Sequence, residues 1–303
     1  MKRLFSNGLS LGLVLLALLA VDAVRAQTHA APAATQKNTV VAFQSPDESA
    51  MPDGDYGRAV KLGEQIFLHT QLHAGAYVGN NLNCASCHLD AGRKANASPF
   101  AAAYVVYPAY RSKNGHVNTF AERLQECFRY SMNGKMPAPG DPVLVALESY
   151  AAWLAKGAPV GGEIAGRGFP KLAKPALPAD YLRGSQVYLQ SCALCHGANG
   201  EGQLSDGKMA FPALWGKQSF NWGAGMHSVD NAAGFIKANM PLALGNSLTD
   251  QQAWDVALFV DSHERPQDPR FTGSAEQTRL KYHDSPYSMY GTVLNGHVLG
   301  AQP

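Results

Sequence analysis

Four of the five cysteines stand in two copies of one short motif, and a histidine follows each copy at once. The pattern C-x-x-C-H is the attachment signal for c-type haem: both thiols bond to the haem vinyl groups, and the histidine ligates the iron. A single C-x-x-C could instead be a redox disulfide or half of a zinc site. Two copies, each with its histidine, predict two covalently bound haem c groups. The attachment residues are Cys84, Cys87 and His88 for the first haem, and Cys192, Cys195 and His196 for the second.

The second axial ligand of each iron sets its potential and its reactivity. For the second haem, Met240 precedes a proline at the distance from His196 that is usual for the methionine ligand of class I cytochromes c. Met209 and Met226 are weaker candidates. The turn around Pro212 is also typical of that class, in which a proline carbonyl accepts a hydrogen bond from the proximal imidazole. We therefore expect Pro212 to orient His196.

For the first haem the residues leave more than one ligand open. Met136 precedes a proline at a similar distance from His88, and Met132 is a weaker candidate. Cys127 is the third candidate ligand. A free thiol in an oxidising compartment is prone to oxidation unless it is buried or has a function such as binding the iron. Spacing alone favours Met136 over Cys127. A thiolate ligand would lower the potential of this haem.

The segments around the two motifs predict helices that position the haems. Apolar residues fall on one helical face of the stretch before each motif, at 56–70 and at 181–191. Two later segments, 141–154 and 249–262, begin with capping residues and carry aromatic and apolar faces. In class I cytochromes c, such a terminal helix packs across the haem-bearing helix. We therefore predict an all-α fold with two class I cytochrome c-like haem domains in tandem, an internal repeat joined by a Gly/Pro-rich linker.

The N-terminus predicts export. Lys2 and Arg3 precede an apolar run, and small residues lead to a cleavage site after Ala26, as in a secretory signal peptide. The run is shorter than the roughly 20 residues that a membrane span needs. We expect a periplasmic protein with no membrane span after cleavage. The predicted division is a signal peptide at 1–26, a weakly ordered stretch at 27–52, haem domain 1 at 53–156, the linker at 157–180, haem domain 2 at 181–265, and a tail at 266–303 that wraps over both domains.

Length and composition agree with this division. The chain has 303 residues, of which 46 % are hydrophobic and 16 % charged, values that favour about two compact domains over disorder. Signal cleavage removes three of the 25 basic residues and one of the 23 acidic ones, so the mature chain is formally neutral. The balance of charge excludes a strong nucleic-acid-binding surface.

The chain resembles the dihaem thiosulfate dehydrogenases, which form tetrathionate in bacterial periplasms, from roughly Asp53 to Tyr290. The resemblance rests on Cys-Ala-Ser-Cys-His-Leu-Asp-Ala-Gly-Arg-Lys at 84–94, Tyr-Pro-Ala-Tyr at 107–110, Arg-Leu-Gln-Glu-Cys-Phe-Arg-Tyr-Ser-Met-Asn-Gly at 123–134, and Phe-Ile-Lys-Ala-Asn-Met-Pro-Leu at 235–242. It implies that Cys127 ligates the first haem and Met240 the second, which leaves Met132 and Met136 as packing residues. Some members carry a competing lysine before the methionine. This chain has Asn239 there, so we expect plain His196/Met240 ligation.

The resemblance also implies that two thiosulfate ions are joined into tetrathionate, with release of two electrons. Two anions that repel each other need fixed cations nearby. On a helix, Arg123 and Ser131 would lie one turn before and one turn after Cys127, on the same face as its sulfur. We predict these three residues as catalytic. Arg111, Lys113 and Arg129 could add further charge.

A thioether-ligated iron has a higher potential than a thiolate-ligated one. We therefore expect electrons to pass from the first haem to the second, and on to a periplasmic carrier such as a small cytochrome c. The sulfur of Cys127 could form a covalent adduct with substrate. The reaction could also run backwards, as tetrathionate reduction. The main alternative is a non-catalytic dihaem electron carrier, which would have no use for Cys127. A cytochrome that oxidises a protein-bound sulfur substrate, or a haem peroxidase, finds less support in the residues.

Overall fold

The computed structural model describes residues 40–301, apart from the side chain of Lys208. The predicted signal peptide, and the predicted weakly ordered stretch up to residue 39, lie outside the described residues. The helices are α1 (Gly54–Leu68), α2 (Thr70–Ala74), α3 (Leu89–Gly92), α4 (Phe100–Tyr104), α5 (Phe120–Glu126), α6 (Pro142–Leu154), α7 (Tyr181–Ser191), α8 (Ala193–His196), α9 (Val229–Asn239), α10 (Asp250–Asp261) and α11 (Ala275–Tyr282). The strands are β1 (Val40–Val41), β2 (Ala109–Arg111), β3 (His116–Asn118), β4 (Glu163–Ile164), β5 (Gln203–Ser205), β6 (Lys208–Phe211), β7 (Val293–Leu294) and β8 (His297–Val298).

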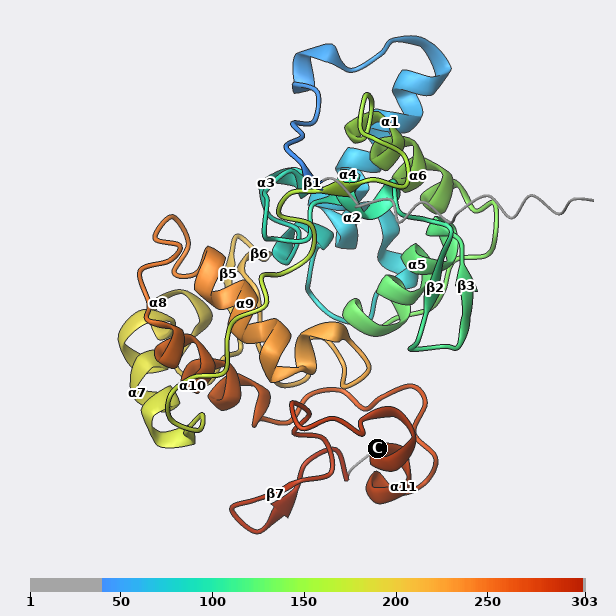
Figure 1. Cartoon of the computed structure of the whole chain (residues 1–303). Coiled ribbons are helices and arrows are strands. Elements are labelled where there is room, and N and C mark those ends of the chain that lie inside the picture. The colour runs from blue at the N-terminus through green and yellow to red at the C-terminus, as the bar shows by residue number, and fades with distance from the viewer. Residues whose placement is uncertain (1–39, 302–303) are drawn as a thin grey trace, which may run out of the picture. The chain divides into compact units, whose positions relative to one another are not determined.

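The first half is built on the contact between α1 and α6, which lie against each other in Figure 1. α6 begins where the Asp141 carboxylate accepts a hydrogen bond from the Val143 amide at 2.8 Å, as the sequence predicts. The two helices approach at Gly63, where a Cβ atom would overlap the carbonyl of Ala146. Val60, Ile66 and Phe67 of α1 pack there with Leu144, Leu147 and Tyr150 of α6, all of them buried.

The second half repeats this arrangement with α7 and α10, and α9 packs against α10 (Figure 1). α10 begins at a capping box in which Thr249 accepts from the Gln252 amide and Gln252 accepts from the Thr249 amide. The crossing point is again a glycine, since a Cβ atom on Gly184 would overlap the carbonyl of Asp255. Each half thus contains the same helix crossing, with a glycine at the point of contact, as expected for the internal repeat predicted from the sequence.

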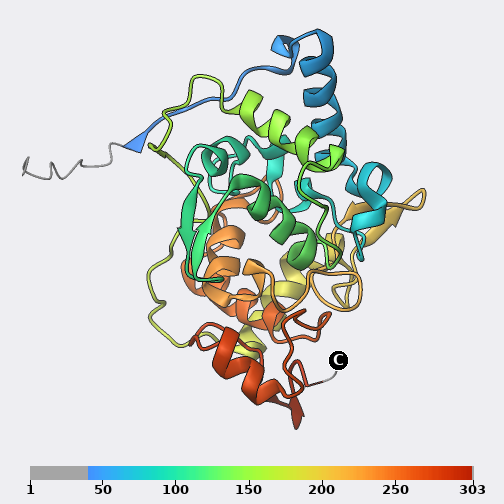
Figure 2. The ribbon, with the colours of Figure 1, turned by 90° about the vertical axis from the view of Figure 1, so that its right-hand side faces the viewer.

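The strands do little to shape the fold. They form four separate two-stranded ladders: β1 with β4 in parallel, and β2 with β3, β5 with β6, and β7 with β8 antiparallel. The chain is therefore helix-rich, with two cytochrome c-like halves in tandem. The linker contributes β4 and then runs without helix or strand to α7, the yellow-green segment of Figure 2.

Residues 40–301 lie in one compact unit, because the two halves and the tail contact each other directly. The side-chain Nδ2 of Asn221 donates to the carbonyl oxygen of Arg129 at 2.9 Å, and Nδ2 of Asn239 donates to the carbonyl oxygen of Asn96 at 3.0 Å. The tail, drawn in red in Figure 2, contains α11 and reaches both halves. Arg129 donates to its Pro269 carbonyl at 3.4 Å, and the Val229 amide donates to its Tyr287 carbonyl at 2.9 Å.

Replacing Gly63 with alanine should destabilise the holoprotein by about 1–3 kcal/mol, because the added methyl group forces α1 away from α6. The midpoint of denaturant unfolding measures the effect. Gly75→Ala is the matched control: a Cβ atom there meets nothing within 4 Å, and its backbone φ of −55° suits alanine. A Gly63→Ala protein as stable as the control would contradict the packing described here.

Candidate functional site

The first haem motif orients its histidine through the backbone. Nδ1 of His88 donates a hydrogen bond to the carbonyl oxygen of Ser98 at 2.7 Å. The contact leaves Nε2 free to ligate a metal ion and fixes the plane of the ring. Burial lowers the pKa of His88, which keeps the imidazole neutral, as a ligand must be. The rings of Phe67 and Phe100 stand 6.0 and 6.2 Å from it, centroid to centroid.

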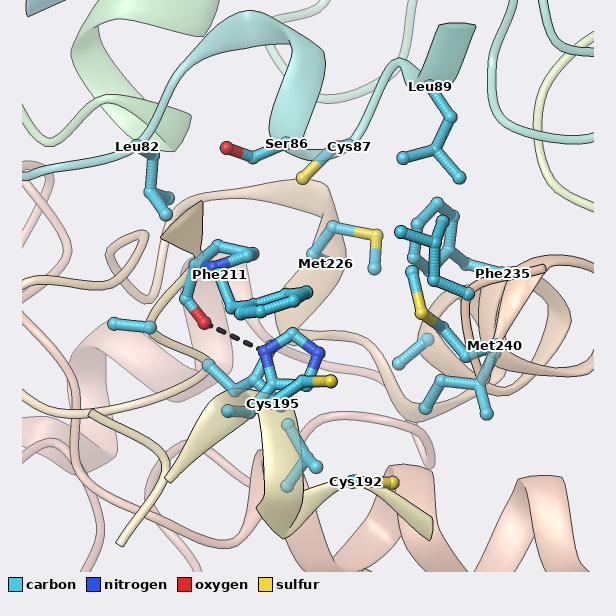
Figure 3. A pocket seen from close by; sticks show the side chains of 18 of the residues that line it. Leu82, Ser86, Cys87, Leu89, Cys192, Cys195, Phe211, Met226, Phe235 and Met240 are labelled. Atoms are coloured by element: carbon cyan, nitrogen blue, oxygen red, sulfur yellow. Dashed lines mark hydrogen bonds between the residues drawn. The ribbon is translucent and has the colours of Figure 1, made fainter. Parts of the chain in front are cut away.

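The second motif uses the same device. Nδ1 of His196 donates to the carbonyl oxygen of Pro212 at 2.8 Å, so the predicted orienting role of Pro212 is confirmed. His196 lines a cavity of about 320 Å³ together with Cys192, Cys195 and Met240. In Figure 3 the side chains of Met226 and Met240 lie on the opposite side of this cavity from Cys195. Met209 lines it as well. A histidine nitrogen and a thioether sulfur can therefore serve one iron.

The residues at both motifs fit covalently bound haem c. No disulfide joins the four motif cysteines, and burial raises the pKa of Cys84 to about 12 and that of Cys192 to about 11. A redox dithiol needs the opposite shift, because the thiolate is the reactive form. The second cavity is lined largely by apolar side chains, as a porphyrin requires. Cys87 of the first motif lines that same cavity, so the two haem sites adjoin (Figure 3).

Cys127 stands at a break in regular helix. α5 begins at a capping box between Thr119 and Glu122, and it gives way at residue 127 to one π-helical turn, Cys127–Ser131. The Met132 amide donates to the Cys127 carbonyl at 2.9 Å, the five-residue spacing of a π-turn. Such turns are rare and frequently lie at functional sites. The expectation that Arg123 and Ser131 share a face with Cys127 assumed an ordinary helix, and the chain departs from one in this turn.

A cation touches the sulfur of Cys127. Nη1 of Arg123 lies 3.2 Å from Sγ and donates a hydrogen bond to it. The same nitrogen is 3.9 Å from Oε2 of Glu126, so the guanidinium has one carboxylate neighbour as well. The Arg123 side chain remains 31 % exposed, which leaves part of the group accessible to a ligand.

Cys127 and Arg123 lie close to the first haem motif. After burial, the charge of Cys127 is the largest influence that raises the pKa of Cys87, and it also raises that of Cys84. The charge of Arg123 contributes to lowering the pKa of His88. The structure thus gathers a proximal histidine, two attachment thiols, a further cysteine and a fixed cation around one place.

Comparison with known proteins agrees with both halves. The family profile of the SoxA/TsdA cytochrome c domain matches residues 71–160, and that of cytochrome c matches residues 181–264. Thiosulfate dehydrogenase of Thiomonas intermedia strain K12 is 54 % identical over 299 residues, which cover 96 % of this chain and 95 % of the relative. Thiosulfate dehydrogenase of Stutzerimonas stutzeri strain A1501 is 52 % identical over 260 residues, 85 % of each chain.

The chain belongs to the thiosulfate dehydrogenase family. A solved member of the family, thiosulfate dehydrogenase TsdBA from Marichromatium purpuratum in its as-isolated form, superposes with a TM-score of 0.84 at 53 % sequence identity. The match covers 86 % of this chain and 57 % of that one. Two cytochrome c domains in tandem, and hence two covalently bound haem c groups, are therefore features of this thiosulfate dehydrogenase homologue.

The other predicted contributors to the site fall into two groups. In the described part of the chain, the Ser131 hydroxyl and the Arg111 guanidinium make no hydrogen bond or ion pair, so both can meet a ligand. Lys113 instead donates to the Gly223 carbonyl at 2.5 Å and lies 3.6 Å from the ring centroid of Tyr130. Arg129 donates to the tail carbonyl named above. Lys113 and Arg129 therefore hold the halves and the tail together.

The resemblance implied that Met132 and Met136 are packing residues, and this expectation is wrong for Met136. Met132 is 3 % exposed and packs in the core of the first half, whereas Met136 is 45 % exposed. The chain leaves the core after residue 134, where the Gly134 amide donates to the Phe128 carbonyl and the Lys135 amide donates to the Tyr77 carbonyl. These contacts carry Met136 to the surface, whereas Pro137 is buried and its carbonyl accepts a hydrogen bond from Gln125 at 2.7 Å.

Two features of the first site escaped the sequence analysis. Ser98 acts through its backbone carbonyl, which no side-chain pattern reveals. Burial raises the pKa of Tyr107, and the charges of Arg123, Arg111 and Cys127 also act on it. The Tyr107 hydroxyl therefore lies near the residues predicted to be catalytic. The Tyr-Pro-Ala-Tyr motif at 107–110 is part of the family resemblance, and it could have pointed to Tyr107, but no role was predicted for it.

Replacing Met240 with leucine should abolish the near-infrared charge-transfer band of a thioether bound to ferric haem, because leucine keeps the volume and removes the sulfur. Met226→Leu and Met136→Leu are the matched controls, one inside the cavity and one on the surface. Both should keep the band. Loss of the band in Met226→Leu, with retention in Met240→Leu, would identify Met226 as the iron ligand in place of Met240.

Proposed function

We propose that this protein oxidises two thiosulfate ions to tetrathionate at the first haem and sends the two electrons out through the second. Membership of the thiosulfate dehydrogenase family supports the reaction. The observation that carries the assignment of the site is the 3.2 Å contact between the Arg123 guanidinium and the Cys127 sulfur. An electron carrier has no need of a lone cysteine paired with a cation beside its haem.

Arg123 has two tasks in the proposed site. Its Nη1 donates a hydrogen bond to the sulfur of Cys127, which as a thiolate would be the group that ligates iron and attacks sulfur. Its remaining donors attract a dianionic substrate, and a guanidinium suits the oxygens of a sulfonate group because it can donate two parallel hydrogen bonds. Arginine keeps its charge at every working pH. Burial lowers the pKa of Lys113 to about 7, so that lysine is a less dependable cation.

Arg111 and Ser131 complete the proposed binding site. Arg111 ends β2 and influences Tyr107 together with Arg123, so a second fixed charge stands near the first. Two thiosulfate ions carry four negative charges, and a single arginine leaves most of that charge uncompensated. The Ser131 hydroxyl adds a neutral donor at the end of the π-turn.

The sulfur chemistry can be written on Cys127. The Cys127 thiolate and the terminal sulfur of one thiosulfate form an S–S bond, giving an S-thiosulfonate, and two electrons are released. The terminal sulfur of the second thiosulfate then attacks the thiosulfate-derived sulfur of that bond. Tetrathionate forms and the Cys127 thiolate leaves. No proton is taken up or released. The two bound haems supply the one-electron acceptors that this chemistry needs.

The second site is the proposed electron exit. Its cavity offers a thioether and an imidazole, and no lone thiol lies among its lining residues. A haem so ligated has a higher potential than a thiolate-ligated haem, which drives electrons from the first site to the second. We propose a periplasmic acceptor such as a small cytochrome c, and operation in reverse as a tetrathionate reductase when the acceptor potential is low.

Export to the periplasm is part of the proposal. It rests on the N-terminal signal pattern and on two motifs whose chemistry belongs to exported cytochromes. Within residues 40–301, no helix has the length and apolar character to cross a bilayer.

Changing Cys127 to glycine should lower thiosulfate turnover at least about 100-fold while both haems stay attached, since only the reacting sulfur is removed. Turnover with an artificial acceptor and the mass of the intact protein measure the two effects. Met132→Leu is the matched control, because it removes the other sulfur of this turn and conserves the volume. Full turnover in Cys127→Gly would favour the non-catalytic electron carrier.

The same pair of proteins tests the covalent step. Unreduced wild-type protein treated with thiosulfate should gain the mass of one thiosulfate on the peptide that contains Cys127, and Cys127→Gly should gain none. If no adduct forms, even in variants slowed at the second step, the thiolate acts only as an iron ligand.

Arg123→Gln should lower kcat/KM for thiosulfate roughly 10- to 100-fold, the value of one charge-assisted contact of about 1.5–3 kcal/mol. Arg129→Gln removes a neighbouring cation that contacts the tail, and should change kcat/KM less than about threefold. Steady-state kinetics at fixed ionic strength compare them. Equal effects of the two substitutions would show that general surface charge, and no specific contact, attracts the substrate.

A further inference from the structure

One carboxyl group lies in the lining of the second haem's cavity. Asp261 is the last residue of α10, and its side chain is 0 % exposed. It lines the cavity together with Val256 and Val260 of the same helix. A buried carboxylate among apolar side chains is costly unless both of its oxygens are compensated. The thiosulfate chemistry and the haem attachment give this group no role.

Arg265 holds Asp261 from behind the cavity wall. Its Nη2 donates to Oδ1 of Asp261 at 3.0 Å and to the carbonyl oxygen of Val260 at 3.0 Å. Its Nη1 donates to the carbonyl oxygen of Leu214 at 3.3 Å, and its guanidinium lies 4.3 Å from the ring centroid of Phe220. Leu214, Val260, Asp261 and Phe220 all line the cavity. The arginine is therefore locked directly behind the lining.

The pair is only half compensated. Among the described residues, Oδ2 of Asp261, Nε of Arg265 and the hydroxyl of Ser262 are buried and have no hydrogen-bond partner. One oxygen of Asp261 thus receives the guanidinium, and the other adds uncompensated negative charge next to the haem cavity when the group is ionised. Such a carboxylate accepts a proton readily, and more readily when further negative charge arrives beside it.

We propose that Asp261 is the proton-accepting group of the second haem and that Arg265 is its positioning residue. When this haem gains one electron, up to one proton from solvent binds the Asp261 carboxylate, so the charge in the cavity changes little. The inference rests on the attached haem and does not depend on thiosulfate turnover.

The surrounding charges set the pH range in which reduction of the second haem is coupled to proton binding by Asp261. Burial raises the pKa of Asp261 to about 7, Arg265 opposes the shift, and Asp230 of α9 adds to it. Asp230 is itself bound by Lys171 at 2.9 Å. On the α7 side, the charge of Arg183 is taken up by Asp255 at 2.8 Å.

His227 and Glu264 also lie close enough to Arg265 to interact with its charge. Burial keeps His227 neutral, because it lowers the pKa well below the ordinary value. Burial also lowers the pKa of His263, which interacts with the charge of Arg265 as well. Among the described residues that line the cavity, Asp261 is accordingly the carboxyl group whose ionisation changes near neutral pH.

The sign of the effect follows from the charge. Protonated Asp261 is neutral and leaves the second haem easier to reduce, whereas ionised Asp261 stabilises the ferric state. The potential of this haem should therefore fall as the pH rises through about 7. The limit is a tenfold change in the reduction equilibrium per pH unit, about 59 mV for a one-electron couple.

The test is a spectroelectrochemical titration of the full dihaem protein between about pH 5 and about pH 9, without substrate, following the band of the thioether-ligated haem. Wild type should show the falling potential. Asp261→Asn should keep the acid-side potential of wild type at every pH. Asp255→Asn, a second buried carboxyl of α10 that pairs with Arg183 outside the cavity lining, should behave as wild type.

Two further measurements need no asparagine variant. Arg265→Gln should move the fall in potential to higher pH, because the opposing positive charge is gone. In wild type near pH 7, the infrared difference spectrum between reduced and oxidised protein should show the carbonyl stretch of a carboxylic acid that appears on reduction. A potential independent of pH in wild type, or an unchanged slope in Asp261→Asn, would overturn the proposal.

Discussion

Both haem sites depend on a hydrogen bond from a proximal imidazole to a backbone carbonyl. A tethered porphyrin presents its iron at one place, and the histidine can meet it only if the ring is held. At the first site the carbonyl of Ser98 is held in turn by the linker, because the Ser98 amide donates to the Gly168 carbonyl at 2.9 Å and the Asn96 amide to the Gly166 carbonyl at 2.7 Å. Gly166 adopts a φ of +74° there, and a Cβ atom would crowd Ala95. The glycine-rich linker is thus part of the first haem site as well as a spacer.

The two halves share a fold and differ on the far side of each haem. In the second half, a methionine after α9 faces an apolar cavity. In the first half, a π-turn presents a sulfur that is already in contact with an arginine. A thioether in an apolar wall suits electron transfer, since it offers no group to an anion. A thiolate beside a guanidinium suits chemistry on an anionic sulfur compound. These differences support the proposal that the first half is the reaction site and the second the electron relay.

The haem attachment residues, the capped helix starts at Asp141 and Thr249 and the orienting carbonyl of Pro212 were all predictable, because each rests on a local pattern with a known geometry. The π-turn was not, since it differs from an α-helix by one residue of register that no side chain announces. The carbonyl of Ser98 and the surface position of Met136 depend on long-range backbone contacts. Asp261 and Arg265 have the ordinary spacing of a helical ion pair, yet they straddle the end of α10, and only the folded chain shows which cavity they adjoin.

The contact of Asn239 with Asn96 ties the two haem sites together. Asn239 directly precedes Met240, and Asn96 stands two residues before Ser98, whose carbonyl orients His88. The end of α9, next to Met240, is therefore bonded to the segment whose carbonyl orients His88. Local opening of either segment breaks this hydrogen bond, so the opening of one site is coupled to that of the other by about 1 kcal/mol.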